Sequence, residues 1–177
     1  MRRKIWLLLT LCPLFWACND NLTKYVKKQI GTKLVIDELH YKPSDLIVLD
    51  SLYKCSQLLI TTTVRKDACP SCFFSLMEDM SLFIDSCHTN KLNCLIFASS
   101  QQFEELSEIL GDYSLPNIFL INDSNGSYSI DNHLEKYTSD FQTFLVDRNK
   151  KIILVGNPML SSKLKKLYYD EITRILK

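Results

Sequence analysis

Two stretches of sequence decide how this chain is expected to fold: QLLITTTV at residues 57–64 and CPSC at residues 69–72, with four residues between them. The first stretch is apolar and β-branched, which is typical of a buried strand. An amphipathic run follows the cysteines, and Pro70 suits a first helical turn because its missing N–H would have no partner there. The sequence therefore predicts a buried strand that leads into a helix opened by Cys69.

The two cysteines of this motif suit reversible disulfide chemistry, because they lie three positions apart at the start of a helix. Free N–H groups and a partial positive charge at the helix start favour the thiolate, which is the reactive form of cysteine. Arg65 and Lys66 would add to this effect, whereas Asp67 would oppose it. The pair Cys69 and Cys72 is the first candidate for a functional site.

The rest of the chain alternates between strand and helix patterns. Two short strands are expected before the motif, at residues 33–36 and 46–49. After the motif, the patterns predict a helix (73–87), a strand (93–98), a helix capped by Ser99 with Gln102, a strand (118–121), a polar loop (123–140) with a helical turn near 133–137, a hairpin (143–147 and 151–155) and a last helix. This order predicts one α/β domain with parallel strands in its core.

This order of elements, with the CPSC motif after the strand at 57–64, resembles the thioredoxin-like superfamily, and specifically its secreted TlpA/redoxin-type thiol-disulfide oxidoreductases. The resemblance covers roughly residue 46 to the end of the chain. It implies an α/β fold with a central mixed sheet flanked by helices, here with a short N-terminal strand extension. It also implies that Cys69 is the exposed nucleophile and Cys72 the more buried thiol that resolves the mixed disulfide.

The same resemblance implies the partners of the reaction. These are protein thiols or disulfides, together with a redox partner that recycles the pair, and the exchange needs no bound cofactor and no metal. The family places a cis-proline opposite the cysteines, just before the hairpin, and Phe141 occupies that position here. A non-proline cis bond costs about 2.5–4 kcal/mol, so we expect a trans bond before Phe141. Phe141 and Gln142 are the residues that the resemblance assigns to substrate docking, and the missing proline leaves that docking open.

The N-terminus has the pattern of an export signal. Residues 1–4 are basic except for Met1, and residues 5–17 form an apolar run shorter than the roughly 20 residues of a spanning helix. A retained membrane anchor is the alternative. Cys18 after Ala17 resembles the processing site of bacterial lipoproteins, as found in Bacteroidota-like organisms. The resemblance implies lipidation of Cys18, a tether over residues 18–32, a thioredoxin-like domain over 33–177, and attachment in the cell envelope, at the outer membrane or the periplasmic face.

Composition limits the other functions that this chain can have. The 177 residues carry a net charge of +1 with both signs interspersed, so no basic stripe suggests a nucleic-acid partner. A non-catalytic binding module with a fixed Cys69–Cys72 disulfide is the main alternative to an oxidoreductase. A copper chaperone resembling the SCO family, with His133 as a third ligand, is a further one. Zinc is disfavoured because only one cysteine pair of the required spacing is present.

Three other cysteines, Cys55, Cys87 and Cys94, are expected at the end of the sheet opposite the motif. Cys55 is expected to begin the strand that leads to the motif, Cys87 to end the helix that follows it and Cys94 to begin the next strand. A structural disulfide among them and three small buried side chains are both consistent with the sequence.

Overall fold

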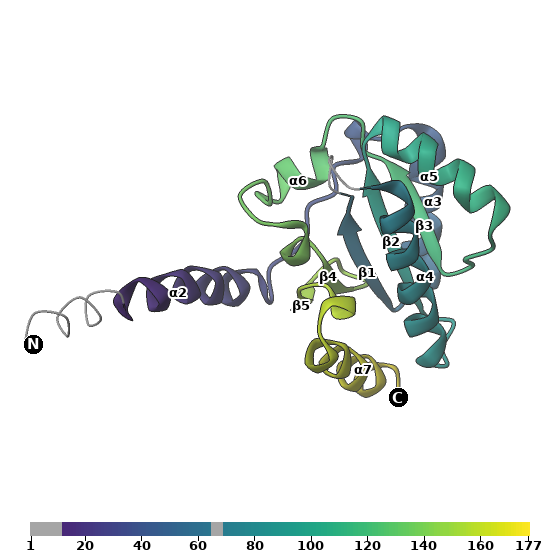
Figure 1. Ribbon diagram of the computed structural model, residues 1–177. Helices are drawn as coiled ribbons and strands as arrows, with labels where there is room; N and C mark the ends of the chain where they lie inside the picture. Colours follow the sequence, from purple (N-terminus) through teal and green to yellow (C-terminus); the bar gives the residue numbers. More distant parts are fainter. Residues whose placement is uncertain (1–11, 65–68) are drawn as a thin grey trace, which may run out of the picture.

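The computed structural model describes residues 12–64 and 69–177 of the chain. Figure 1 shows the elements in chain order: α2 (Cys12–Gln29), η1 (Glu38–His40), α3 (Pro43–Cys55), β1 (Leu58–Thr63), α4 (Pro70–Ser86), β2 (Leu92–Ala98), α5 (Ser100–Asp112), β3 (Ile118–Asn122), α6 (Ser127–Asp131), η2 (Ser139–Phe141), β4 (Phe144–Asp147), β5 (Ile152–Val155), η3 (Pro158–Leu160) and α7 (Ser162–Leu176). Most of the predicted export signal, residues 1–11, lies outside the described residues, as do Arg65, Lys66, Asp67 and Ala68.

The five strands form one mixed sheet in the order β3-β2-β1-β4-β5. Strands β1, β2 and β3 are parallel, whereas β4 runs antiparallel to both β1 and β5. The predicted hairpin is thus present as β4 and β5, and β1 occupies the centre of the sheet. This arrangement confirms the predicted thioredoxin-like α/β fold with a mixed sheet flanked by helices.

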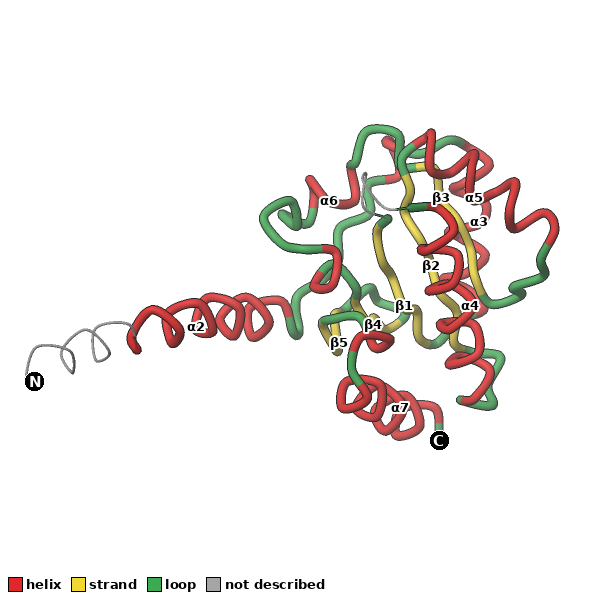
Figure 2. Tube along the Cα trace, in the orientation of Figure 1, coloured by secondary structure: helices red, strands yellow, loops and turns green. Residues whose placement is uncertain are grey.

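Both faces of the sheet are covered, which explains why its central strands β1 and β2 are buried along their whole length. Leu59 on one face of β1 belongs to a cluster that includes Leu49 and Leu52 of α3 and Tyr25 of α2. Ile60 on the other face belongs to a second cluster, with side chains from α4, α5 and α7. Helices therefore lie on either side of the sheet, as the tube in Figure 2 also shows.

The predicted strand at residues 46–49 is wrong, because these residues lie within α3. Four apolar residues in a row fit either a strand or one side of a buried helix. The helix signals around them are Pro43 at the first helical position and Asp45 in the first turn. Packing against the sheet decides between the two, since α3 contacts β3 and buries Leu49 and Leu52.

The predicted strand at residues 33–36 is reduced to a single bridge. Lys33 pairs with Lys151 in an antiparallel bridge, so this segment extends the β5 edge of the sheet by only one residue pair. Alternate residues still face the core, with Leu34 and Ile36 buried and Val35 exposed. The short N-terminal extension of the sheet is therefore this one contact.

The segment predicted as a tether is helical from Cys18 to Gln29, because it forms most of α2. Tyr25 attaches this helix to the domain: its ring stacks on Tyr137 at 3.5 Å between centroids, and its hydroxyl donates to the Phe141 carbonyl at 3.0 Å. No helix within residues 12–64 and 69–177 has both the length and the apolar character needed to cross a membrane. The boundaries of signal, tether and domain stay predictions.

Candidate active site

The cysteine motif lies where the central strand meets the start of a helix. Strand β1 ends at Thr63, and α4 begins at Pro70 with Cys69 as its N-cap residue. The Cys69 backbone is extended, with φ −66° and ψ 123°, and its carbonyl accepts the N–H of Phe73 at 3.0 Å. The helix thus starts as predicted, with the Cys69 side chain at its positive end.

The thiol of Cys69 is exposed and has a hydrogen-bond partner within its own turn. Its Sγ lies 3.1 Å from the Ser71 hydroxyl. This hydroxyl, the backbone N–H of Cys72 and the Cys72 thiol together lower the pKa of Cys69 to about 7, with Ser71 contributing most. A cysteine with this pKa is about half thiolate at neutral pH, compared with a few per cent for an ordinary one.

The second thiol responds in the opposite direction. The pKa of Cys72 is raised, first by its hydrogen bond to Cys69 and then by the negative charge that Cys69 carries. Cys69 therefore ionises first, while Cys72 keeps its proton and donates it toward the Cys69 sulfur. Two neighbouring thiols whose pKa values are shifted in opposite directions can divide the work of disulfide exchange. One acts as the attacking thiolate, and the other stays protonated until the mixed disulfide has formed.

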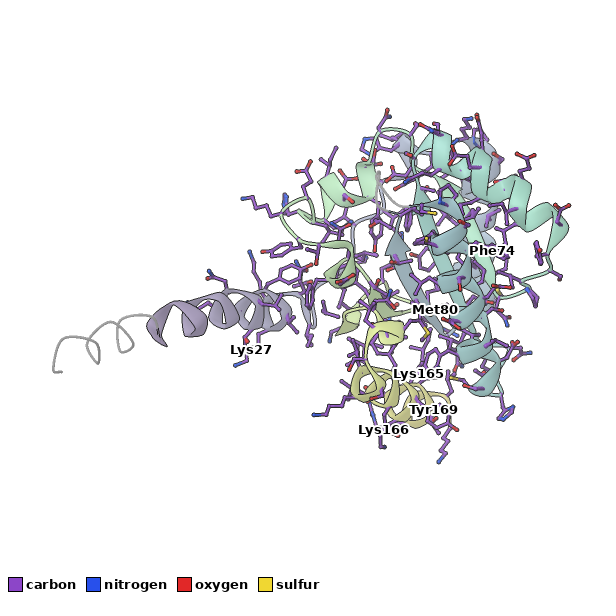
Figure 3. All side chains as sticks on the ribbon, in the orientation of Figure 1. Lys27, Phe74, Met80, Lys165, Lys166 and Tyr169 are labelled. Carbon is purple, nitrogen blue, oxygen red and sulfur yellow. The ribbon has the colours of Figure 1, made fainter. Side chains whose placement is uncertain are left out.

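One prediction about this pair is wrong, since Cys72 is exposed like Cys69 rather than more buried. The reason is the direction in which α4 packs. Its first buried side chain is that of Phe74, which lies against Tyr113 with 5.0 Å between ring centroids. Figure 3 labels Phe74 and Met80 on this helix.

The residues at the predicted docking position have specific structural contacts. Phe141 ends η2, packs partly buried against the α2 and α3 side of the sheet, and no peptide bond among the described residues is cis. Gln142 bonds three ways: its Oε1 accepts from Thr63 Oγ1 at 2.5 Å, and its Nε2 donates to the carbonyls of Leu134 at 2.9 Å and Tyr137 at 2.8 Å. Gln142 thus connects the loop before β4 to Thr63 at the end of β1. Thr63 lies six residues before Cys69 in the sequence.

A cavity of about 590 Å³ opens at this end of the sheet, and sequence reasoning did not find it. Its wall combines the end of β1, at Thr63 and Val64, with Gln142 and the polar segment that follows β3. Glu135 and Lys136 supply its charged side chains, besides Asp123. The run of small polar residues at 123–129 was the only sequence signal for it, and such a run is equally typical of a surface loop.

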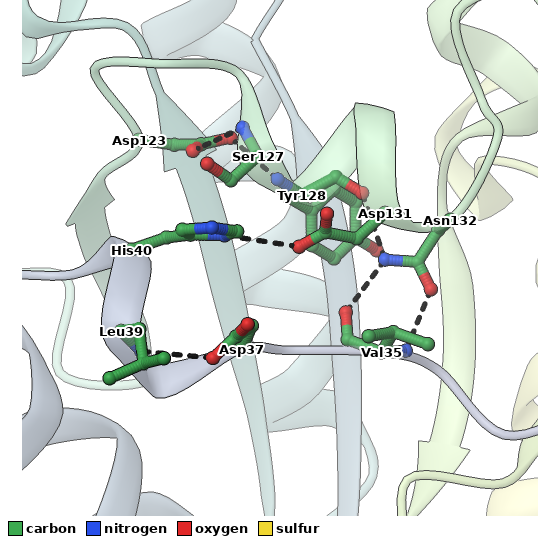
Figure 4. Close-up of polar contacts among 9 residues, drawn as sticks. All are labelled: Val35, Asp37, Leu39, His40, Asp123, Ser127, Tyr128, Asp131 and Asn132. Carbon is green, nitrogen blue, oxygen red and sulfur yellow. Dashed lines mark hydrogen bonds and ion pairs between the residues drawn. The ribbon is translucent and has the colours of Figure 1, made fainter.

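Asp123 organises one wall of the cavity, as Figure 4 shows. Its carboxylate accepts the backbone N–H of Ser127 at 2.8 Å and of Tyr128 at 3.1 Å, and so starts α6. Burial raises the pKa of Asp123 and is only partly offset by these two hydrogen bonds. The helical turn predicted near residues 133–137 is wrong, because α6 forms earlier in the loop.

The segment before α3, residues 35–40, contacts α6 on the side away from the cavity. Asn132 exchanges two hydrogen bonds with the Val35 backbone, both at 2.7 Å, and also donates to the Tyr128 carbonyl at 2.8 Å. Next to it, His40 Nδ1 lies 3.3 Å from Asp131 Oδ2 (Figure 4). The N-terminal segment thereby holds α6 in place at the rim of the cavity.

Cys55, Cys87 and Cys94 are free thiols in the structure. Cys94 is fully buried in β2 with its pKa raised to about 12 by burial, so it acts as a core residue. Cys87 follows the last turn of α4, and Cys55 ends α3 rather than starting a strand. Within residues 12–64 and 69–177 no three histidine, cysteine or acidic side chains gather as a metal site would require. His133, the copper ligand suggested by the SCO alternative, is an exposed loop residue after α6.

The chain is similar in structure to several solved proteins. An uncharacterised thioredoxin-like protein from Porphyromonas gingivalis is 15% identical, with a TM-score of 0.49 over 67% of this chain and 76% of that one. A putative thiol-disulfide oxidoreductase from Bacteroides vulgatus is 10% identical, with a TM-score of 0.49 over 68% and 80%. Yeast Sco1 is 14% identical, with a TM-score of 0.49 over 71% and 81%. At this identity the likeness concerns the fold alone.

No protein-family model matches the chain, and no curated protein matches it. The sheet order and its mixed strand directions are those of a thioredoxin-like α/β fold. Within that fold, the exposed Cys69 and Cys72 lie at the start of the helix that follows the central strand.

Proposed function

We propose that this protein exchanges disulfides with protein substrates through Cys69 and Cys72. The observation that carries the proposal is the exposed Cys69 thiol at the start of α4, with a pKa of about 7 and the Ser71 hydroxyl 3.1 Å away. A structural cysteine would gain nothing from this environment. A nucleophile needs it, because the thiolate is the attacking species.

In the reducing direction, the reaction has two steps. The Cys69 thiolate attacks one sulfur of a substrate disulfide, so a mixed disulfide forms and the other substrate sulfur leaves as a thiolate. Cys72 then loses its proton and attacks the Cys69 sulfur, which releases the second substrate thiolate and leaves a Cys69–Cys72 disulfide. Two electrons pass from the pair to the substrate, and a reducing partner must return them. The oxidising direction is the reverse.

The docking of the substrate is assigned to the loop before β4. The family resemblance assigns substrate docking to Phe141 and Gln142, and Gln142 also borders the 590 Å³ cavity. Because the Gln142 side chain is held by three hydrogen bonds, its backbone has a fixed place beside the end of β1. We assign the docking of the polypeptide around the disulfide to this place.

The location is assigned from the N-terminal sequence. Export, lipidation of Cys18 and attachment to a membrane of the cell envelope fit a thiol-disulfide enzyme, because disulfides persist in oxidising compartments. Mass spectrometry of the protein from bacterial membranes tests the lipid, since a lipidated chain begins at Cys18 with added acyl mass. A chain found with Met1 or Asn19 as its first residue would contradict lipidation.

The redox assignment is tested by the reduction potential of the pair. The full chain carrying Cys18→Ser is equilibrated in glutathione buffers, and its thiols are trapped with acid and counted by mass spectrometry. A potential between about −120 and −270 mV with rapid exchange supports an oxidoreductase. A potential below about −300 mV, or exchange only after unfolding, would instead indicate that Cys69 and Cys72 form a fixed structural disulfide and that the protein is a binding module.

A trapping variant gives a second, independent readout. Cys72→Ser leaves Cys69 without its resolving thiol, so it should accumulate mixed disulfides with substrate proteins. Cys55→Ser is the matched control, since Cys55 is also exposed but ends α3, away from the motif. Equal accumulation in both variants would argue against Cys69 as the nucleophile.

A further inference from the structure

Five exposed cationic side chains from two distant parts of the sequence lie near one edge of the sheet. They are Lys27 and Lys28 in the last turn of α2, Lys33 just after it, and Arg148 and Lys151 around the turn of the β4–β5 hairpin. Backbone bonds join the two parts: Gly31 N–H donates to Ile152 O, and Leu34 N–H to Lys150 O, both at 2.8 Å. We call these five residues the basic surface, and Figure 3 labels Lys27 on its α2 part.

Two members of the basic surface face each other directly. Lys33 and Lys151 form the antiparallel bridge, and the flanking bonds, Leu34 N–H to Lys150 O and Ile152 N–H to Thr32 O, make it a non-hydrogen-bonded pair. In such a pair the side chains lie closest together, and like charges directly opposite each other are destabilising.

The structure does not neutralise this charge. None of the five cations forms an ion pair with another described residue. The nearest acid in sequence, Asp147, uses its Oδ1 to accept the backbone N–H groups of Asn149 and Lys151 at 2.8 and 2.9 Å. Lys150, beside the surface, is half-buried over the Tyr53 ring, and its pKa is lowered by burial and by Lys33, with Glu38 acting against them. An anionic partner would relieve the repulsion.

The position of the surface indicates which anionic partner fits. It lies at the base of α2, and Cys18, the proposed lipid site, is eleven residues before Gln29 in the same helix, about 17 Å along its axis. Cationic residues beside a lipid anchor strengthen membrane binding through their attraction to anionic lipids. Anionic headgroups attract Lys and Arg within about a Debye length of the bilayer.

We propose that the basic surface docks on the anionic headgroups of a lipid bilayer, an inference that shares the membrane location assigned under the proposed function. Docking there also sets an orientation. Leu58 at the start of β1 pairs with Asp147 beside the hairpin turn, whereas Cys69 follows the other end of β1. The cysteine pair then faces away from the bilayer, toward substrates in the aqueous phase.

Vesicle binding tests this proposal. The mature chain from residue 18, carrying Cys18→Ser, is mixed with phosphatidylcholine vesicles or with vesicles in which phosphatidylglycerol replaces part of that lipid, and the bound fraction is measured by co-sedimentation. We expect tighter binding to the anionic vesicles and weaker binding at high salt. The double variant Lys33→Gln/Lys151→Gln should lose roughly tenfold or more of the anionic preference. It should also unfold no more easily than the parent, because it removes a repulsive pair.

The matched control is Lys163→Gln/Lys177→Gln, which removes two exposed lysines outside the basic surface and should bind as the parent does. Equal losses in the two double variants, or no preference for anionic lipid, would overturn the proposal. So would tighter binding to a DNA duplex than to the anionic vesicles. The assay involves neither the lipid on Cys18 nor any redox step, so its failure is separate from failure of the proposed function.

The orientation has its own readout. The rate at which a water-soluble maleimide labels Cys69, read from its peptide by mass spectrometry, should be the same for free and vesicle-bound protein. Protection of Cys69 on the vesicles would overturn the orientation.

Discussion

Ser71, the third residue of the CPSC motif, sets the reactivity of its neighbour Cys69. The helix start supplies the backbone N–H of Cys72, but the Ser71 hydroxyl is the larger cause of the lowered pKa. A hydrogen bond to a charged partner is stronger than one to a neutral partner, so the Ser71 hydroxyl stabilises the thiolate more than the thiol. The residue between the cysteines therefore acts on the nucleophile directly.

We predict that Ser71→Ala raises the pKa of Cys69 from about 7 toward the 8.5 or so of an ordinary cysteine. Alkylation of Cys69 by iodoacetamide should increase with pH through a midpoint near 7 in the parent. In the variant this midpoint should move to higher pH, and the rate at neutral pH should fall several-fold. Peptide mass spectrometry follows Cys69 alone during the reaction.

Two internal references accompany this measurement. Ser75→Ala removes an exposed hydroxyl one turn further along α4 and should leave the midpoint where it was. Cys94, fully buried with a pKa of about 12, should stay unlabelled until the protein unfolds. An unchanged midpoint in Ser71→Ala would mean that the helix start alone sets the pKa of Cys69.

At the scale of elements, the loop between β3 and β4 is fixed at two points. Asn132 joins α6 to the segment before α3, and Gln142 joins the end of the loop to β1. Between them lies much of the cavity wall. The loop has little regular structure of its own, so these side chains define its shape.

Gln142→Glu tests the second of these points. A glutamate keeps the oxygen that accepts from Thr63 but replaces the amide donor that faces the Leu134 and Tyr137 carbonyls. We predict that this variant loses about 2 kcal/mol or more in the free energy of unfolding, because a carboxylate then faces two carbonyl oxygens. Gln142→Leu should lose less, roughly 1–3 kcal/mol, because it removes the bonds without adding charge. Urea unfolding measures both.

The same variants separate docking from thiol chemistry. The midpoint of Cys69 alkylation should stay near 7 in Gln142→Leu, while exchange with a protein disulfide slows. Gln101→Leu, an exposed glutamine of α5 bonded only to Glu105 at 3.0 Å, is the control for both measurements. If Gln142→Leu exchanges disulfides as fast as the parent, Gln142 has no part in docking.

Asn132→Ala tests the other contact that fixes the loop between β3 and β4, the one made by Asn132. It removes two hydrogen bonds between α6 and the segment at Val35 and a third to the Tyr128 carbonyl within α6, and we expect a loss of about 1–3 kcal/mol in the free energy of unfolding. Hydrogen exchange at the Val35 amide should accelerate by more than this global loss explains, because the segment opens locally. Asn90→Ala, at an exposed position before β2, should change neither measurement. Exchange at Val35 as slow as in the parent would contradict the role of Asn132.

The elements also show what the sequence could and could not predict. The hairpin and the start of α4 were predictable because local signals, such as Pro70 and the turn at residues 148–150, agree with the final structure. Residues 46–49 were not, because a run of four apolar residues takes its conformation from what it packs against. Gln142 was placed by resemblance, but its three hydrogen bonds exist only once the loop has closed on β1.

At the scale of the whole molecule, buried acids set how stability depends on pH. Asp45 in the first turn of α3 is 7% exposed, and its Oδ2 has no hydrogen-bond partner among the described residues. Burial raises its pKa, and the attraction of Lys42 offsets this only in part. Asp123 is shifted in the same direction, also by burial. Both acids hold a proton more tightly in the folded than in the unfolded state.

The sign of the effect follows from proton linkage. Unfolded aspartate titrates near pH 3.9, so between about pH 4 and the raised pKa the folded state binds more protons than the unfolded one. Stability contributed by such a group is present at low pH and is lost as the pH rises through this window. At neutral pH, the Asp45 carboxylate is therefore charged, although its buried surroundings favour the neutral carboxylic acid.

We predict that Asp45→Asn makes the protein more stable at pH 7 and leaves its stability near pH 3.5 almost unchanged, because the amide resembles the protonated acid in shape and charge. Urea unfolding across this pH range measures the difference, which should grow steadily above about pH 4. Asp50→Asn is the control on the same helix: Asp50 is exposed and pairs with Lys54 at 2.5 Å, so its loss should cost at most about 0.5 kcal/mol. If Asp45→Asn is less stable than the parent at pH 7, then its carboxylate is satisfied in solution by contacts such as water, and burial does not govern its titration.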